Sequence, residues 1–279
     1  MPKQEIYVAK ANKKVAAALA NTSSPFTIEV RFLGGLSKKQ KDAFKTAADR
    51  WSKVIVGDLP SVMVDGEVID DLLILAQGQA IDGPGTILGQ AGPTRLRPAS
   101  AGAAAFLPAK GKMAFDTADL KQMEKDGTLK DVITHEMGHV LGIGTIWSQK
   151  GVLSGAGTSN PTFTGAAAKA EFGKLKGTGP AAVPVENTGG AGTRDSHWRE
   201  SVFRNELMTG FVGAANNPLS RMTVGSLQDL GYVVDFKAAE AYSLPNLLAL
   251  AEGALAAQPA AKGMMLPNIP IVLPDDSLQ

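Results

Sequence analysis

The chain has 279 residues, of which 44% are hydrophobic and 20% are charged, and both fractions are ordinary for a soluble globular protein. Its 28 lysines and arginines nearly balance its 27 aspartates and glutamates, so no net field attracts nucleic acid or an anionic membrane. The absence of cysteine excludes disulfides, thiolate metal ligands and cysteine nucleophiles. Any metal site must therefore use nitrogen or oxygen ligands.

We expect neither a standard signal peptide nor a transmembrane segment. Basic residues precede the apolar run 15–20, but this run is shorter than the roughly 7 to 15 apolar residues of a signal peptide. Residues 244–251 are interrupted by Asn246 and fall well short of the roughly 20 apolar residues that span a bilayer. We expect a bacterial chain that is cytoplasmic or leaves the cell by a leaderless route.

The first part of the chain predicts an arm, a strand and a helix. Residues 1–25 show little periodicity, which is typical of a mobile arm or of an edge that packs late. Residues 26–33 alternate and are rich in Ile, Val and Phe, so they predict a strand. Ser37 and Gln40 form a capping box that starts a helix. One face of this helix is apolar and predicted to be core: Phe44, Ala47, Ala48, Trp51, Val54 and Ile55.

Short strands and loops follow. Residues 72–76 and 113–115 are short apolar runs typical of buried strands. Residues 83–105 are rich in Gly, Pro and Ala, which predicts loops with at most an edge strand. Thr117 is a predicted helix cap.

The second half of the chain is loop-rich, with residues 166–172 as its clear helical stretch. Ser220 predicts the start of a last helix, which Gly231 ends. The composition shifts to Ala, Leu and Pro after Asp235, so we place a domain boundary there and expect residues 236–279 to form a tail that packs on the domain or binds elsewhere.

The candidate chemistry lies on a helix that Thr128 caps and that spans residues 129–141. This helix contains the motif HExxH, in which His135 and His139 are four residues apart and therefore project from one face. One metal ion can meet both imidazoles. Glu136 lies beside the first ligand, where it can take a proton from a water molecule that the metal activates and pass it to a leaving amine.

The third metal ligand is predicted from the inventory of histidines. The chain has only three, and the one outside the motif is His197. A catalytic zinc ion usually takes three protein ligands and keeps a fourth position open, and His197 is the one imidazole left to complete that set. We therefore expect one catalytic Zn²⁺.

Two other functions remain open from the residues alone. The first is a binding or adhesion module that holds zinc as a structural brace, although such a site has no need of a carboxylate like Glu136 beside an open metal position. The second is an HExxH peptidase whose third ligand is a glutamate, with Glu171 and Glu186 as the candidates. The loop composition around these two glutamates does not favour a ligand helix.

Residues 135–142, HEMGHVLG, resemble the zinc helix of the metzincin peptidases, in which the glycine, here Gly142, ends the helix and turns the chain toward a third ligand. Compact metzincins carry that histidine three residues after the glycine, where this chain has Thr145. The leishmanolysin-like branch instead has a long insertion before its third histidine. This chain is similar to that branch over residues 26–235.

Three further stretches carry the leishmanolysin-like resemblance: residues 189–192 (GGAG) before His197, residues 206–210 (ELMTG) after it, and residues 228–232 (QDLGY) in the last helix. The resemblance implies a zinc endopeptidase that acts on protein or peptide substrates. It also implies that Met208 is the Met-turn residue, a hydrophobic floor beneath the metal rather than a ligand.

The resemblance implies an α+β fold of the metzincin type. Residues 26–142 would form an upper subdomain, a twisted mixed sheet with two long helices above a zinc cleft. Residues 143–235 would form a loop-rich lower subdomain with a C-terminal helix, flanked by the arm 1–25 and the tail 236–279.

Some features of the eukaryotic family members do not carry over. Their disulfides, their latency through a propeptide cysteine and their frequent lipid anchor are not expected in this cysteine-free chain. No tyrosine closely follows Met208, so we expect zinc and backbone groups to stabilise the developing oxyanion.

Overall fold

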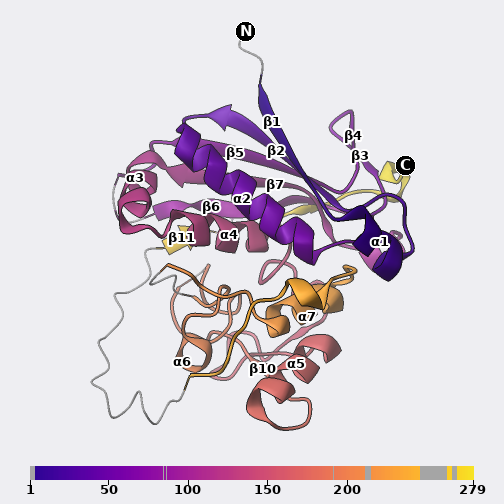
Figure 1. Cartoon of the computed structure of the whole chain (residues 1–279), viewed down its shortest axis with the longest axis vertical. Coiled ribbons are helices and arrows are strands. Elements are labelled where there is room, and N and C mark those ends of the chain that lie inside the picture. The colour runs from indigo at the N-terminus through magenta and orange to yellow at the C-terminus, as the bar shows by residue number, and fades with distance from the viewer. Residues whose placement is uncertain are drawn as a thin grey trace.

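The computed structural model describes residues 4–83, 85, 87–190, 192–210, 215–245, 263–265 and 269–279. These residues form a mixed α+β fold around a twisted seven-stranded sheet with the order β1-β2-β5-β7-β6-β11, in which β12 also pairs with β6 (Figure 1). The α+β class that the sequence predicts is confirmed at this level.

The bounds of the elements are as follows. The large sheet contains β1 (Glu5–Lys10), β2 (Thr27–Gly34), β5 (Leu72–Gln79), β6 (Ile87–Leu96), β7 (Pro108–Asp116), β11 (Gly263–Met265) and β12 (Ile271–Val272). The smaller strands are β3 (Val62–Val64) and β4 (Glu67–Ile69), which form a hairpin, and β8 (Leu153–Ser154), β9 (Thr162–Phe163) and β10 (Val183–Pro184), which form a second small sheet. The α-helices of the described chain are α1 (Lys13–Ala20), α2 (Lys38–Val54), α3 (Thr117–Asp126), α4 (Leu129–Val140), α5 (Ala166–Lys176), α6 (Glu200–Phe203) and α7 (Arg221–Leu230).

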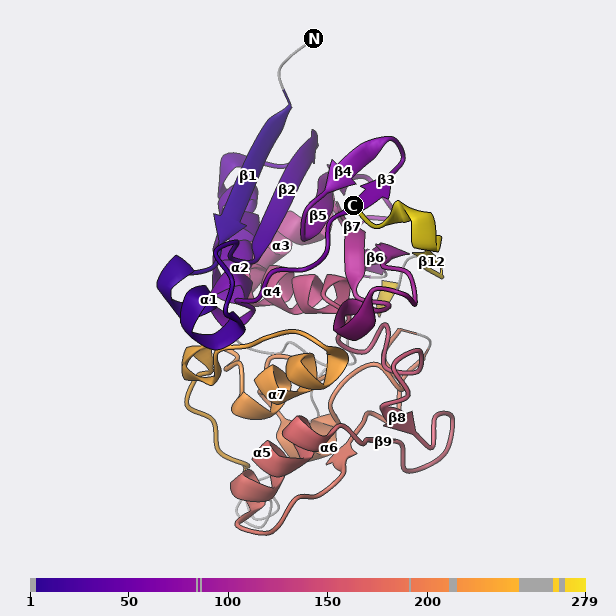
Figure 2. The same ribbon diagram turned by 90° about the vertical axis from the view of Figure 1, so that its right-hand side faces the viewer.

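Helices α2 and α4 pack on one face of the large sheet, and α4 lies between that sheet and the region of α5, α6 and α7 (Figure 2). The apolar face of α2 is buried as its periodicity predicts, and its capping box at Ser37 and Gln40 is present. The indole Nε1 of Trp51 donates a hydrogen bond of 2.9 Å to the carbonyl oxygen of Thr134 in α4. Helix α2 therefore holds α4 against the sheet. No helix of the described chain is long and apolar enough to cross a bilayer.

Residues 5–10 form an edge strand of the sheet, as the sequence analysis allowed for an edge that packs late. Strand β1 pairs antiparallel with β2, from Glu5 opposite Phe32 to Lys10 opposite Thr27. Ala9 is buried, and the hydroxyl of Tyr7 donates a hydrogen bond of 2.7 Å to Asp49 of α2. Helix α1, which the sequence did not predict, begins after the N-cap Asn12.

The expectation of loops with at most an edge strand in residues 83–105 is wrong. Strand β6 has ten residues and lies inside the sheet, antiparallel to β7 on one side and parallel to β11 and β12 on the other. Because β11 and β12 lie more than 160 positions further along the chain, local sequence gives no sign of this pairing. Two short pieces of the predicted tail, β11 and β12, thus belong to the sheet, and Leu273 beside them is buried.

Two predicted helix caps differ from the structure. Helix α3 is capped by Asp116, whose carboxylate accepts hydrogen bonds from the backbone N–H of Ala118 (2.7 Å) and of Asp119, so Thr117 is the first helical residue rather than the cap. Thr128 occupies the N-cap position of α4, but its side chain makes no capping bond there. Ser220 does cap α7, by accepting from the N–H of Thr223, and Gly231 ends that helix.

Candidate metal centre

Helix α4 brings the motif residues to one buried face. His135, Glu136 and His139 are 4%, 3% and 1% exposed. The helix ends at Val140, and Gly142 follows with φ of 107°, a left-handed conformation that favours glycine. The helical path of the chain therefore ends within three residues of His139.

A second glycine lets the chain that precedes His197 come close to this turn. A Cβ atom added to Gly144 would lie 1.9 Å from the carbonyl oxygen of Ser196, so no side chain fits there. Gly144 itself has φ of 75°. The backbone next to His197 therefore lies directly against the turn that follows α4, although His197 is 58 positions from His139.

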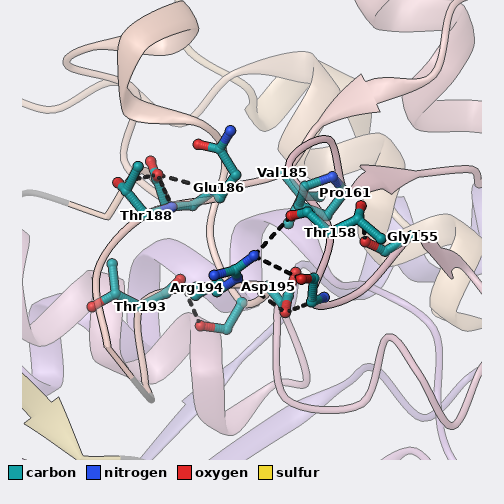
Figure 3. A network of polar contacts seen from close by, with 12 residues as sticks. Gly155, Thr158, Pro161, Val185, Glu186, Thr188, Thr193, Arg194 and Asp195 are labelled. Carbon is teal, nitrogen blue, oxygen red and sulfur yellow. Dashed lines mark hydrogen bonds and ion pairs between the residues drawn. The ribbon is translucent and has the colours of Figure 1, made fainter.

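Polar contacts fix the loop that carries His197 (Figure 3). The guanidinium of Arg194 donates 2.8 Å hydrogen bonds to the carbonyl oxygens of Gly157 and Thr158, and the carboxylate of Asp195 accepts one of 2.9 Å from the N–H of Gly157. The N–H of Glu186 donates to the carbonyl oxygen of His197 at 2.8 Å. These contacts tie residues 194 and 195, just before His197, to residues 157 and 158, and tie His197 itself to Glu186.

The two glutamates of the rival ligand set lie elsewhere. The carboxylate of Glu186 accepts hydrogen bonds from the backbone N–H groups of Asn187, Thr188 and Glu200. Glu171 forms ion pairs with Lys174 and Arg221. Among the described residues, the group of potential metal ligands that includes the motif histidines contains neither glutamate.

Instead, His135, His139 and His197 form one buried cluster. Their Nε2 atoms are 3.0 to 3.1 Å apart. Each Nδ1 lies within hydrogen-bond distance of a backbone carbonyl: Leu207 for His135 (2.7 Å), Ile143 for His139 (2.8 Å) and Thr193 for His197 (3.0 Å). A carbonyl can only accept, so each Nδ1 carries the proton and the three Nε2 lone pairs converge on one point.

This donor set suits zinc. Burial lowers the pKa of each of the three histidines to about 3, so all three imidazoles are neutral at physiological pH, which is the form that binds a metal. Glu136 lies beside the cluster, with its Oε1 3.9 Å from Nε2 of His135, and burial raises the pKa of its carboxyl well above the usual value. A dication held by the imidazoles would favour the charged form of Glu136 again.

Met208 packs against the middle of the zinc helix. It is fully buried, and a Cβ atom added to Gly138 would lie 2.8 Å from its sulfur. The carbonyl acceptors of the imidazoles cannot be predicted from the sequence, because every residue type supplies a backbone carbonyl. Glu206 is buried beside Met208, and its only signal in the sequence is its place in the Glu-Leu-Met stretch.

The hydroxyls of the chain's three tyrosines donate hydrogen bonds to groups other than the three histidines. Tyr7 donates to Asp49, Tyr232 to the carbonyl of Leu141 at 2.9 Å, and Tyr242 to the carbonyl of Phe203 at 2.7 Å.

Three buried, convergent imidazoles on and beside an HExxH helix make this a metal centre of the metallopeptidase class. The family model of leishmanolysin, peptidase family M8, matches residues 103–249, which is more than half of the 279 residues. The chain therefore belongs to the leishmanolysin family of zinc-dependent metallopeptidases, which act on proteins. No curated protein sequence matches the chain.

Proposed function

We propose that this protein is a zinc endopeptidase that cleaves internal peptide bonds of protein substrates, with His135, His139 and His197 as the metal ligands and Glu136 as the general base. The observation that carries the proposal is the convergence of the three Nε2 atoms, 3.0 to 3.1 Å apart, with the Glu136 carboxylate 3.9 Å from one of them. The cleft would lie between residues 26–142 and 143–235, the two parts of a metzincin-type fold.

The chemistry is hydrolysis without a covalent intermediate. Zinc, when bound, would supply a Lewis acid that lowers the pKa of a water molecule toward about 7 and polarises the scissile carbonyl. Glu136 accepts the proton from the attacking water and delivers it to the leaving amine nitrogen. The Nδ1 hydrogen bonds to Leu207, Ile143 and Thr193 keep the three imidazole rings in their ligand orientation.

Met208 and Gly142 have supporting roles in this proposal. Met208 forms the apolar floor of the centre, because its sulfur packs against Gly138, one residue before the ligand His139. Gly142 ends the zinc helix and directs the chain toward the loop that supplies His197. A binding module with a structural zinc remains the alternative, and the buried Glu136 beside the cluster argues against it.

Glu136→Gln tests the general base. Because glutamine keeps the shape of the side chain and removes the proton acceptor, we expect bound zinc to stay and hydrolysis to fall by roughly 10²-fold to 10⁴-fold. Zinc content by metal analysis and cleavage of an unfolded protein substrate are the two measurements. Turnover near the wild-type rate in a zinc-loaded Glu136→Gln protein would reject the assigned base.

Peptides blocked at both ends separate endopeptidase from exopeptidase activity. An N-acetylated, C-amidated peptide offers no free terminus, so an endopeptidase cleaves it and its unblocked counterpart at the same internal bond. Mass spectrometry of the products identifies that bond. Cleavage of the unblocked peptide alone, from one end, would contradict the endopeptidase assignment.

A further inference from the structure

Glu206 is a buried carboxylate to which the proposed catalytic chemistry gives no task. It is 1% exposed and lies in the turn that leads to Met208. Its Oε2 accepts a 2.6 Å hydrogen bond from the backbone N–H of Met208. Its Oε1 accepts from the N–H of Ser220 at 3.1 Å, from the hydroxyl of Ser220 at 2.7 Å and from the hydroxyl of Thr223. Every one of these donors is a neutral group, so one carboxylate fastens the turn 206–208 to the N-terminus of α7.

The turn that Glu206 holds is in contact with the metal-ligand cluster at two points. The carbonyl of Leu207, the residue between Glu206 and Met208, accepts the hydrogen bond from Nδ1 of His135 at 2.7 Å. The carbonyl of Met208 accepts from the backbone N–H of Trp198 at 2.9 Å, directly after His197. The turn therefore orients the side chain of one ligand and holds the backbone of the residue that follows a second ligand.

A shared hydroxyl joins these contacts into one network. The indole Nε1 of Trp198 donates to the hydroxyl oxygen of Thr223 at 2.8 Å, and the same hydroxyl donates its proton to Glu206. The hydroxyl of Ser220 likewise donates to Glu206 and accepts from the N–H of Thr223. Both hydroxyls donate to Oε1 and the backbone N–H of Met208 donates to Oε2, so the network requires an acceptor at both oxygens of residue 206.

We propose that Glu206 is a positioning residue for the metal centre: it fixes the turn 206–208 so that Leu207 orients the imidazole of His135 and Met208 holds the backbone N–H of Trp198, the residue after His197. The inference deepens the proposed function, on which it rests for the identity of the ligands. Outer partners of metal ligands set their orientation and their affinity for the ion. A carboxylate is needed because an amide would turn a donor toward either the N–H of Met208 or the donors of Ser220 and Thr223.

Glu206→Gln tests this role, with Glu171→Gln as the matched control. Glu171 is also a buried glutamate that contacts α7, through Arg221, but among the described residues its ion-pair partners, Lys174 and Arg221, are not metal ligands. We expect Glu206→Gln to raise the dissociation constant for zinc by about 10-fold to 100-fold, measured by competition with a chelating dye. We expect the visible spectrum of the cobalt(II)-substituted protein to change as well. Glu171→Gln should match the wild type in both measurements.

Thr223→Val keeps the proposal testable if Glu206→Gln does not fold. Valine removes one donor to Glu206 and the acceptor of the Trp198 indole. Zinc affinity should therefore fall in Thr223→Val, but by a smaller factor than in Glu206→Gln. Wild-type affinity and spectrum in the folded variants, or an equal loss in Glu171→Gln, would overturn the role of Glu206. These measurements need no turnover, so a Glu206-dependent affinity in a protein without peptidase activity would reject the proposed function alone.

Discussion

Each imidazole of the cluster depends on a carbonyl from a different stretch of chain. His139 uses Ile143 just after its own helix, whereas His135 and His197 use Leu207 and Thr193. Because each ring has its own acceptor, replacing one imidazole removes no hydrogen bond of the other two, but two imidazoles bind zinc far more weakly than three.

His197→Ala tests the third ligand. We expect zinc affinity to fall by more than the ~100-fold that loss of an outer partner causes, and hydrolysis to fall with it. Glu171→Ala and Glu186→Ala should keep the metal, since both carboxylates have other partners. Metal analysis after dialysis against a zinc buffer gives the comparison. Full occupancy in His197→Ala would remove this residue from the ligand set.

At the residue scale, the sequence predicts the metal-binding side chains better than the backbone groups that orient them. The four-residue spacing of His135 and His139 places both on one helical face, and the shortage of histidines selects His197. The structure brings all three together. The carbonyls that orient them could not be predicted, because their position depends on how distant turns pack and any residue type supplies a carbonyl.

At the scale of elements, the position of His197 depends on the contact between the turn after α4 and the chain before His197. Gly144→Ala would force the new Cβ into the carbonyl of Ser196, which lies 1.9 Å from its position, and displace the backbone beside His197. Because a residue other than glycine is strained at this left-handed φ, we expect the free energy of unfolding to fall by roughly 1 to 2 kcal/mol. We also expect a clear loss of zinc affinity. Thermal unfolding of the metal-free protein and chelator competition measure the two effects.

Gly151→Ala is the matched control for this prediction. Gly151 has φ of 66°, close to the 75° of Gly144, but a Cβ atom there meets nothing within 4 Å. The Gly151→Ala protein should therefore lose stability because of the strained backbone, but it should bind zinc as tightly as the wild type. If both variants bind zinc as the wild type does, the close approach at Gly144 does not position His197.

The elements that were predicted well are those with local signals. The capping box at Ser37 and the N-cap at Ser220 start their helices because the cap bonds lie within three residues. Strand β6 was missed because its sequence, with Gly89, Gly92 and Pro93, has weak strand propensity. Its stability comes from β7 on one side and from the C-terminal strands on the other.

At the scale of the whole molecule, the metal ligands join two parts of the chain that other contacts also connect. Helix α4 belongs to the layer beneath the sheet, whereas His197 belongs to the loop-rich part of the chain. The end of α2 also meets the segment after α7, where the N–H of Val56 donates to the carbonyl of Val233 at 2.9 Å and that of Asp235 to Val54 at 2.8 Å. Loss of the metal should therefore loosen the loops around His197 before it unfolds the sheet.

Removal of zinc tests this order of events. A ligand at ~1,000 times its dissociation constant stabilises the folded state by about 4 kcal/mol, so stripping the metal with a chelator should lower the midpoint of thermal unfolding. An added protease should then cut within residues 144–192 faster than within the large sheet, which mass spectrometry of the first fragments can locate. In His197→Ala, the chelator should change neither the midpoint of thermal unfolding nor the rate of cleavage within residues 144–192, because the variant already lacks the metal ligand that connects the loop to α4. A chelator effect of wild-type size in His197→Ala, or first cuts in the sheet, would show that the metal does not hold these loops.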